Sequence, residues 1–286
     1  MSTRCRRQPA PIVRRLGVCL LSTFLLSSGG CALLRPAPPP PLPPAEVVAA
    51  LRETAERFHT VTDTDISLHI SVTADGKTQR APSLGGLIAF NARLPGLWLD
   101  TEKVTRRVFS LKALGERFYL AIFETREVVT GGPAAYARLP HLVRPGEVRS
   151  FFAGPDRLGL TWPDTTMAVQ ADEYRFDVPV AGVLRSRVLV DRRKVVVTAI
   201  RRYDALGRTV TEVVLGGHKQ TDGVPFPRRL TVERPLDGVK VELRLGDPRL
   251  NKELPAATFL PPQRPGWRVI DLDRQPLSAV EAFRTE

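Results

Sequence analysis

The sequence predicts a mainly β (α+β) fold, in which a strongly curved antiparallel sheet of about ten strands wraps around an N-terminal helix and a short helical lid. Beyond residue 65, apolar and polar residues alternate with a period of two over most of the chain, which is typical of strands with one buried face. Turn residues such as Asp75-Gly76 separate these segments, as in hairpins. A curved sheet buries its apolar face against the helices. A closed barrel or a two-sheet sandwich would bury that face differently.

Two segments are expected to be helical. Residues 45–58 place Val47, Leu51 and Phe58 on one stripe at helical spacing. Residues 145–154 begin with proline and end with glycine, which predicts a short helix. This second piece is the expected lid, with the residues Val148, Phe151 and Phe152.

The strands follow the first helix as one long meander. The expected strands lie at residues 66–72, 85–92, 97–101, 106–114, 117–125, 184–190, 194–204, 208–216, 227–235 and 239–247. Residues 128–166 show neither a helical nor a strand period. Gly85-Gly86 is expected to mark a β-bulge or a close backbone approach. No second linker and no internal repeat divides this region, so residues 45–272 are expected to form one domain, followed by a loose tail at 273–286.

Residues 1–30 have the three parts of an export signal. Five arginines precede an apolar run at 16–26, and four small residues follow at 27–30. The apolar run is too short for a membrane-spanning helix, which needs about 20 residues. We therefore expect a cleaved signal peptide, with a retained N-terminal membrane anchor as the alternative.

Cys31 follows the small residues directly. The other two cysteines, Cys5 and Cys19, lie within the signal, so Cys31 has no partner for an intramolecular disulfide in the mature chain. Residues 26–31, "LSSGGC", resemble the lipobox of bacterial lipoproteins, although Ser28 stands where the common pattern has leucine. The resemblance implies that Cys31 carries diacylglyceryl and acyl groups such as palmitate. Ordinary cleavage that leaves a free thiol is the alternative.

The resemblance to bacterial lipoproteins also implies a location. Ala32 stands after the cysteine, where an aspartate tends to retain such proteins in the inner membrane, so we expect a lipid anchor in the outer membrane, facing the periplasm. Residues 31–44 contain the lipidated cysteine and a proline-rich stalk, in which seven of the nine residues 36–44 are proline. At about 3.1 Å per residue, those nine residues would span roughly 28 Å as a polyproline II segment. A disordered leader is the alternative.

The charge balance favours contact with an anionic lipid or another acidic partner. The net charge is +12 for the whole chain, and without residues 1–30 it is +7, from 37 Lys and Arg against 30 Asp and Glu. The basic residues are spread along alternate strand positions beside acidic ones, and an exported chain meets little nucleic acid, so no nucleic-acid partner is expected.

Motifs for catalysis or metal binding are not expected either. No two of the four histidines stand at i, i+4 on an expected helix, and the Asp63/Asp65 pair is typical of a turn. The sequence contains neither a nucleophile elbow nor a phosphate loop. We therefore expect a protein that is not an enzyme and has no metal or cofactor.

The order of the elements resembles the LolA/LolB family of lipoprotein carriers. The resemblance rests on the helix after the cysteine, the meander, "RPGEVRSFFAGP", the run "DALGRTVTEVVLGGHKQTDGVPFPRRLTVERP" and the ending "LNKELPAATFLPPQRPGWRVIDL". It implies a half-barrel whose apolar cavity binds the acyl chains of a lipid or lipoprotein cargo during lipoprotein sorting to the outer membrane. It also implies a soluble periplasmic carrier as a partner, and we expect a monomer. The alternative is a lipid-sensing or scaffolding lipoprotein of the same fold, resembling RseB or LppX/LprG, with no delivery role.

The apolar strand faces supply the candidate binding residues. The expected cavity lining is Ile66, Leu68, Ile70, Ile88, Phe90, Leu97, Leu99, Val241, Leu243 and Leu245. A filled core without a cavity is the alternative for all of them. Trp98 has the opposite strand parity to its neighbours, so we expect it to be exposed and to contact the membrane.

Overall fold

The structure is a computed structural model that describes residues 38–138, 144–150, 152, 154–261 and 263–274. The chain divides into two compact units, residues 1–38 and Pro39–Glu286, and the fold below concerns the second. The expected signal peptide at 1–30, the lipidation site Cys31, the lid residue Phe151 and residues 275–286 of the tail lie outside the described residues.

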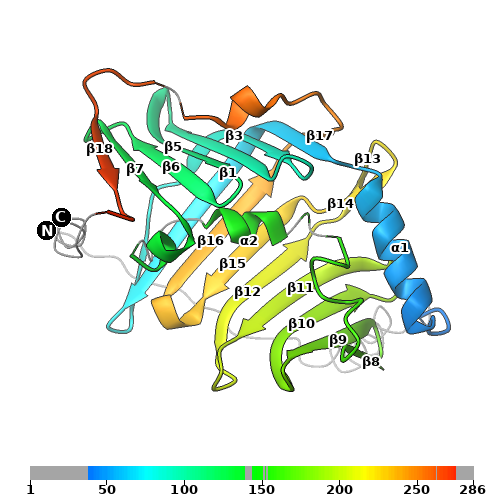
Figure 1. Cartoon of the computed structure of the whole chain (residues 1–286). Coiled ribbons are helices and arrows are strands. Elements are labelled where there is room, and N and C mark those ends of the chain that lie inside the picture. Colours follow the sequence, from blue (N-terminus) through cyan, green and yellow to red (C-terminus); the bar gives the residue numbers. More distant parts are fainter. Residues whose placement is uncertain (1–37, 139–143, 151, 153, 262, 275–286) are drawn as a thin grey trace, which may run out of the picture. The chain divides into compact units, whose positions relative to one another are not determined.

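The described part of the domain is mainly β, with one large sheet of 16 strands and two α-helices (Figure 1). The strands on one side of the sheet, in spatial order from the edge, are β18 (Arg268–Asp271), β7 (Glu127–Gly131), β6 (Arg117–Ile122), β5 (Arg106–Leu114), β4 (Gly96–Lys103), β3 (Leu84–Asn91) and β1 (Thr60–Ala74). The order continues with β16 (Val239–Leu245), β15 (Arg229–Arg234), β12 (Thr209–Gly216), β11 (Val196–Tyr203), β10 (Val183–Asp191), β9 (Glu173–Val180) and β8 (Thr166–Val169). β2 (Lys77–Arg80) and β17 (Arg249–Leu250) also pair with β1, and β13 (Lys219–Thr221) and β14 (Val224–Phe226) form a separate hairpin.

The sheet consists of two meanders that meet at one pair of strands. We call β1 and β3–β7 the first meander, and β8–β12, β15 and β16 the second meander. They meet where β1 pairs antiparallel with β16, with Ile66 opposite Leu245. In the described part of the chain, the two edges of the sheet, β18 and β8, do not pair with each other, so the closed-barrel alternative is wrong.

The number of strands is larger than the expected ten. The strands expected from residue 66 to 125 and from 184 to 247 are all present, and β5 has the predicted limits of 106–114. The additional ones include β7, β8 and β9, in and just after the region where no period was visible. The sheet is also mixed, because β18 pairs parallel to β7. The polypeptide reaches this position through a C-terminal segment whose 3₁₀ turn, Ala256–Phe259, packs on β4 and β5.

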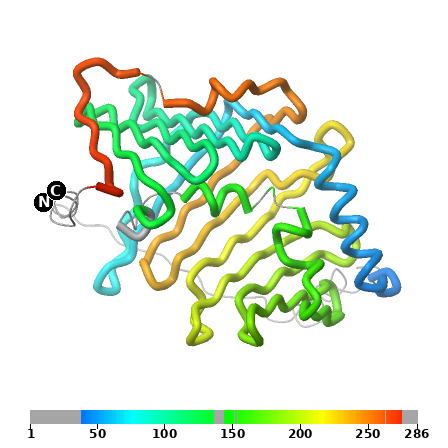
Figure 2. Tube along the Cα trace, viewed as in Figure 1, coloured from blue at the N-terminus to red at the C-terminus, as the bar shows by residue number. Residues whose placement is uncertain are grey.

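The two helices agree with the expected positions. α1 (Pro44–Glu56) buries Val47 and Leu51, as the helical stripe predicts, and ends before Phe58. Its track beside the strands of the second meander is visible in Figure 2. α2 (Pro145–Ser150) is shorter than expected and buries Val148. Ser150, the last residue of α2, accepts a hydrogen bond of 2.6 Å from Arg202 on β11, which places α2 over the second meander.

Buried charges hold α2 on the sheet. Arg234 of β15 points inward with its neighbours Leu230 and Val232, and its side chain is 1% exposed. Its Nη1 lies 2.9 Å from Oε2 of Glu147 on α2, whose side chain is 5% exposed, and its Nε lies 3.2 Å from Oδ2 of Asp237. A buried charge needs such a partner, because its desolvation is costly. The pair therefore fixes where α2 can sit.

Candidate functional site

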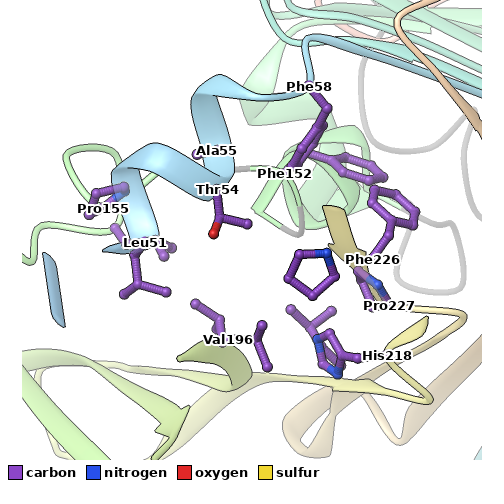
Figure 3. Close-up of a pocket in the computed structure, with 14 residues that line it drawn as sticks. Leu51, Thr54, Ala55, Phe58, Phe152, Pro155, Val196, His218, Phe226 and Pro227 are labelled. Atoms are coloured by element: carbon purple, nitrogen blue, oxygen red, sulfur yellow. The ribbon is translucent and has the colours of Figure 1, made fainter. Parts of the chain in front are cut away.

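A small apolar cavity lies between α1 and the second meander (Figure 3). Its volume is about 60 Å³. It is lined by Leu51, Thr54, Ala55, Phe58, Phe152, Pro155, Leu158, Val196, Val197, Leu215, His218, Pro225, Phe226 and Pro227. None of these described residues is Asp, Glu, Lys or Arg, so the wall is suited to an apolar group.

Three phenylalanine rings, those of Phe58, Phe152 and Phe226, line the cavity, and a fourth, that of Phe90, packs against them. Phe152 is central: its ring stacks on Phe90 with the centroids 4.2 Å apart and on Phe226 with the centroids 5.8 Å apart. Phe58 meets Phe152 and Phe226 edge to face, at 6.2 and 5.5 Å. The rings come from four separate segments of the chain, so they tie the α1 end, β3, β14 and the segment after α2 together. In Figure 3, Phe58, Phe152 and Phe226 stand in a row beside α1.

A wider groove of about 570 Å³ adjoins the cavity on the other side of these rings. Ala55, Phe58, Phe152 and Pro155 line both spaces. The rest of the groove is polar and is lined by Arg52, Glu56, His59, Ala92, Arg93, Gly154, Asp156 and Arg157. The lining of the groove is therefore mostly polar, whereas that of the cavity is mostly apolar, and the rings of Phe58 and Phe152 are among the walls that the two spaces share.

His218 and Thr54 are the polar side chains in the cavity wall. Burial lowers the pKa of His218, and the nearby ammonium of Lys194 lowers that pKa further, against a smaller opposing effect of Asp191. The imidazole is therefore neutral at pH 7, and the cavity wall carries no formal charge there. Such a surface can accept an alkyl chain without separating an ion pair.

The ten residues expected to line a cavity lie in the hydrophobic core. Nine are buried, and Ile70 is partly buried and packs against the core. They come from β1, β3, β4 and β16, and none of them is in the wall of the cavity or the groove described above. Phe90 is next to the cavity, because its ring stacks on Phe152. A role in ligand binding stays a prediction for these ten residues.

Trp98 is half-buried and not fully exposed. It points to the opposite face from Leu97 and Leu99, as its parity predicts, and its indole Nε1 is buried. The ammonium of Lys112 lies 4.5 Å from the ring centroid and donates a hydrogen bond of 2.7 Å to the carbonyl of Thr258. The C-terminal segment thus covers part of the face on which Trp98 stands. Membrane contact by Trp98 stays a prediction.

The described lid residues are buried. Val148 of α2 is 2% exposed and Phe152 is 6% exposed, so both contribute to the core while Phe152 also walls the cavity. The sequence missed the cavity residues on the second meander, although the buried Val213 and Leu215 of β12 flank the exposed Val214, and Leu215 lines the cavity. That alternation was the available signal, and it is the same as that of an ordinary core strand.

The described residues contain no group of three or more His, Cys, Asp or Glu side chains placed to hold a metal ion. Among the same residues, no helix has the length and apolar character needed to cross a membrane.

No protein-family model matches the sequence, and no curated protein is significantly similar to it. Solved structures do resemble it. A LolA superfamily protein of Nitrosomonas europaea has 14% identity and a TM-score of 0.47, and the match covers 75% of this chain and 97% of that one. A Vibrio parahaemolyticus domain described as an outer membrane lipoprotein-sorting protein has 10% identity and a TM-score of 0.49, over 75% and 94% of the two chains. A DUF1329 family protein of Desulfovibrio piger has 15% identity and a TM-score of 0.46, over 74% and 97%.

The chain is similar in structure to LolA superfamily proteins. This is the similarity that the order of elements in the sequence predicts. The similarity concerns the fold alone.

Proposed function

We propose that the domain binds acyl chains of a lipid or lipoprotein between α1 and the inner face of the sheet. The observation that carries this proposal is the cavity wall without a formal charge, which joins α1 to β11, β12 and β14. Transfer of an alkyl chain from water to such a wall lowers the free energy by about 25 cal/mol per Å² of apolar surface buried. No covalent chemistry is needed for this function.

The cavity must enlarge before it can hold a chain. Its 60 Å³ correspond to about two water molecules, whereas ligand pockets usually measure about 300–1,000 Å³. The adjoining groove of 570 Å³ is in that range. Ala55, Phe58, Phe152 and Pro155 line both spaces, and the rings of Phe58 and Phe152 are the bulkiest of these shared side chains. We infer that a chain enters from the groove as these rings turn aside, and that a half-barrel mouth opens between α1 and the sheet.

Filling the cavity is expected to abolish binding. In Leu215→Trp, the larger side chain would occupy the cavity, and affinity for a fluorescent fatty acid is expected to fall about tenfold or more, which corresponds to at least ~1.4 kcal/mol. The matched control is Val214→Trp, because Val214 is the adjacent residue on β12 and is exposed on the opposite face. Native mass spectrometry of the purified proteins would show co-purified lipid in the control and the parent, and little in Leu215→Trp. Equal lipid content and affinity in both variants would contradict the proposal.

A transfer assay distinguishes the two proposed roles of the domain, delivery of a lipoprotein and sensing of a lipid. We propose delivery to the outer membrane, so the protein is expected to accept a labelled lipoprotein from a soluble periplasmic carrier and pass it to a bilayer. Bound lipid without any transfer would instead favour the sensing or scaffolding lipoprotein. The charge of +7 beyond residue 30 supports a place beside an anionic surface, but it does not distinguish these two roles.

The membrane anchor is proposed to be Cys31. Cys31→Ala removes the only thiol beyond the expected signal, so the protein is expected to move from the membrane fraction to the soluble fraction after cell disruption. Immunoblotting of the separated fractions measures the change. Ser28→Leu, which brings the sequence closer to the common lipobox, is the control and should stay with the membrane. A Cys31→Ala protein that fractionates like the parent would refute the anchor.

A further inference from the structure

The outer face of the second meander carries a regular set of ion pairs. The outer face is the side of the sheet opposite the cavity, and the polar residues of β9–β12, β15 and β16 point to it. Cations and carboxylates on neighbouring strands pair across this face: Arg187–Asp177 at 2.6 Å, Arg201–Glu212 at 2.7 Å and Lys240–Glu233 at 2.9 Å. Each of these cations is therefore paired with a carboxylate on the neighbouring strand.

This pairing stops at Arg229 and Arg244. The two arginines are directly opposite each other on β15 and β16, and both are exposed. Like charges in such positions repel and destabilise a sheet. Among the residues that the structure describes, neither arginine has a carboxylate within ion-pair distance. A pair of this kind is expected where an anion from outside the domain supplies the missing charge.

A third arginine, Arg80, lies on the same outer face, on the side of β1 away from β16. Arg80, the last residue of β2, is opposite Ser71 of β1, and Ser71 is in turn opposite Lys240 of β16. Residues that face each other across strands point to the same side of a sheet, so Arg80, Ser71 and Lys240 share the outer face. No ion pair of Arg80 is present among the described residues either.

A hollow of about 290 Å³ lies between Arg80 and Arg244. It is lined by His69, Ile70, Ser71, Arg80, Ala81, Lys240, Glu242 and Arg244. Lys240 is already neutralised, since its ammonium lies 2.9 Å from Glu233 and 3.3 Å from Glu242. Lys240, Glu233 and Glu242 together carry one negative charge. The cations of the hollow without an ion-pair partner among the described residues are Arg80 and Arg244, one on each side, with the hydroxyl of Ser71 beside them, so the net charge of these five charged groups is +1.

We propose that this hollow binds an anionic phosphate group between Arg80 and Arg244, with Arg229 next to it. A guanidinium group presents paired N–H donors that match two phosphate oxygens, and such charge-assisted hydrogen bonds are stronger than neutral ones. Inorganic phosphate carries between one and two negative charges at neutral pH, and the phosphodiester of a lipid head group carries one, so either group reduces the excess positive charge of Arg80, Arg229 and Arg244. The group is either free phosphate or the phosphate of a lipid head group. The site is on the opposite face from the acyl cavity, so it does not depend on the function proposed above.

The test compares two variants with the same loss of charge. The full chain with Cys31→Ala, which removes any lipid anchor, serves as the parent in every arm. The site variant carries Arg80→Gln and Arg244→Gln. The control carries Arg106→Gln and Arg249→Gln, which are exposed positions on β5 and β17 outside the hollow. The probes are inorganic phosphate, measured by calorimetry, and vesicles of phosphatidylglycerol or phosphatidylcholine, measured by co-sedimentation.

Phosphate affinity is expected to fall about tenfold or more in the site variant and to stay within about twofold in the control. The same loss seen only with phosphatidylglycerol vesicles also supports the site and assigns it to lipid head groups. Without any anion, the site variant is expected to unfold at a slightly higher temperature than the parent, because the repulsion between Arg229 and Arg244 is removed. A parent that binds neither probe overturns the proposal. So does an equal loss in both variants.

Discussion

Arg234→Met is expected to lower the free energy of unfolding by about 3–5 kcal/mol, because it leaves the buried carboxylate of Glu147 without its cation. The ion pair joins α2 to β15 at 2.9 Å, and both side chains are almost fully buried. Asp237 also loses a contact with Arg234, but it keeps the ion pair of 3.0 Å with Arg144. Urea denaturation followed by circular dichroism measures the change.

The control for this substitution is Arg187→Met. It removes the same side chain from an ion pair of similar length, 2.6 Å, but that pair is on the outer face, where its loss should cost at most about 1 kcal/mol. In the double variant Arg234→Met/Glu147→Gln, part of the lost stability should return, since the lone charge is then absent. Equal costs for Arg234→Met and Arg187→Met would show that the buried pair has no special role in holding α2.

Gly86→Ala is expected to destabilise the domain by about 3 kcal/mol or more. Gly86 has a φ of +151°, a conformation that residues with a side chain rarely adopt. A Cβ atom at this position would overlap the backbone oxygen of Asp100 on the neighbouring strand β4. The strand pair β3–β4 would have to separate locally. Chemical denaturation of the purified variant measures the loss.

Gly85→Ala is the matched control for Gly86→Ala. Gly85 precedes Gly86 on β3, has no positive φ, and a Cβ there would lie 3.8 Å from the backbone oxygen of Ile66, an ordinary contact distance. Its cost is expected to stay within about 1 kcal/mol. If the two alanine variants unfold at the same denaturant concentration, the close approach at Gly86 is not a constraint.

The sequence predicted local structure well at positions where the residue type itself indicates a backbone conformation, such as glycine and Asp-Gly. The Gly85-Gly86 pair predicted a bulge or a close backbone approach, and the close approach is found at Gly86, where a Cβ atom would overlap the backbone oxygen of Asp100. The register of β1 and β3 also shifts nearby, but the extra residue is in β1, between Asp63 and Ile66. The Asp75-Gly76 turn is confirmed by positive φ angles at both residues. Such features depend on residues that are adjacent in the sequence, so they can be predicted from the sequence alone.

Partners that are distant in sequence could not be predicted in this way. The parallel pairing of β18 with β7 leaves no local mark, because Arg268–Asp271 has the composition of any short strand. The buried Arg234 did have a signal, since it is in phase with Leu230 and Val232 on β15. That signal was ambiguous until Glu147 was found opposite it, 87 positions away in the chain.

The candidate site was predicted least well, for a related reason. An apolar residue that lines a cavity and one that fills a core have the same alternation, so Leu243 on β16 and Leu215 on β12 were equivalent choices. What distinguishes them is the position of α1, which leaves space above Leu215. The distance between a helix and a sheet is a property of the packed domain and has no counterpart in a strand pattern.

The pairing of β1 with β16 has a consequence for how the domain is made. Within each meander most neighbouring strands are also neighbours in sequence, so hairpins can form early and quickly. The seam between the meanders joins the first strand of the domain to one of its last, and nearly the whole domain lies between them. Closing so long a loop costs entropy before any contact repays it. During synthesis, the edge of β1 that faces β16 would therefore wait unpaired until β16 has been made, and in that interval the exposed edge is a site for pairing with another chain.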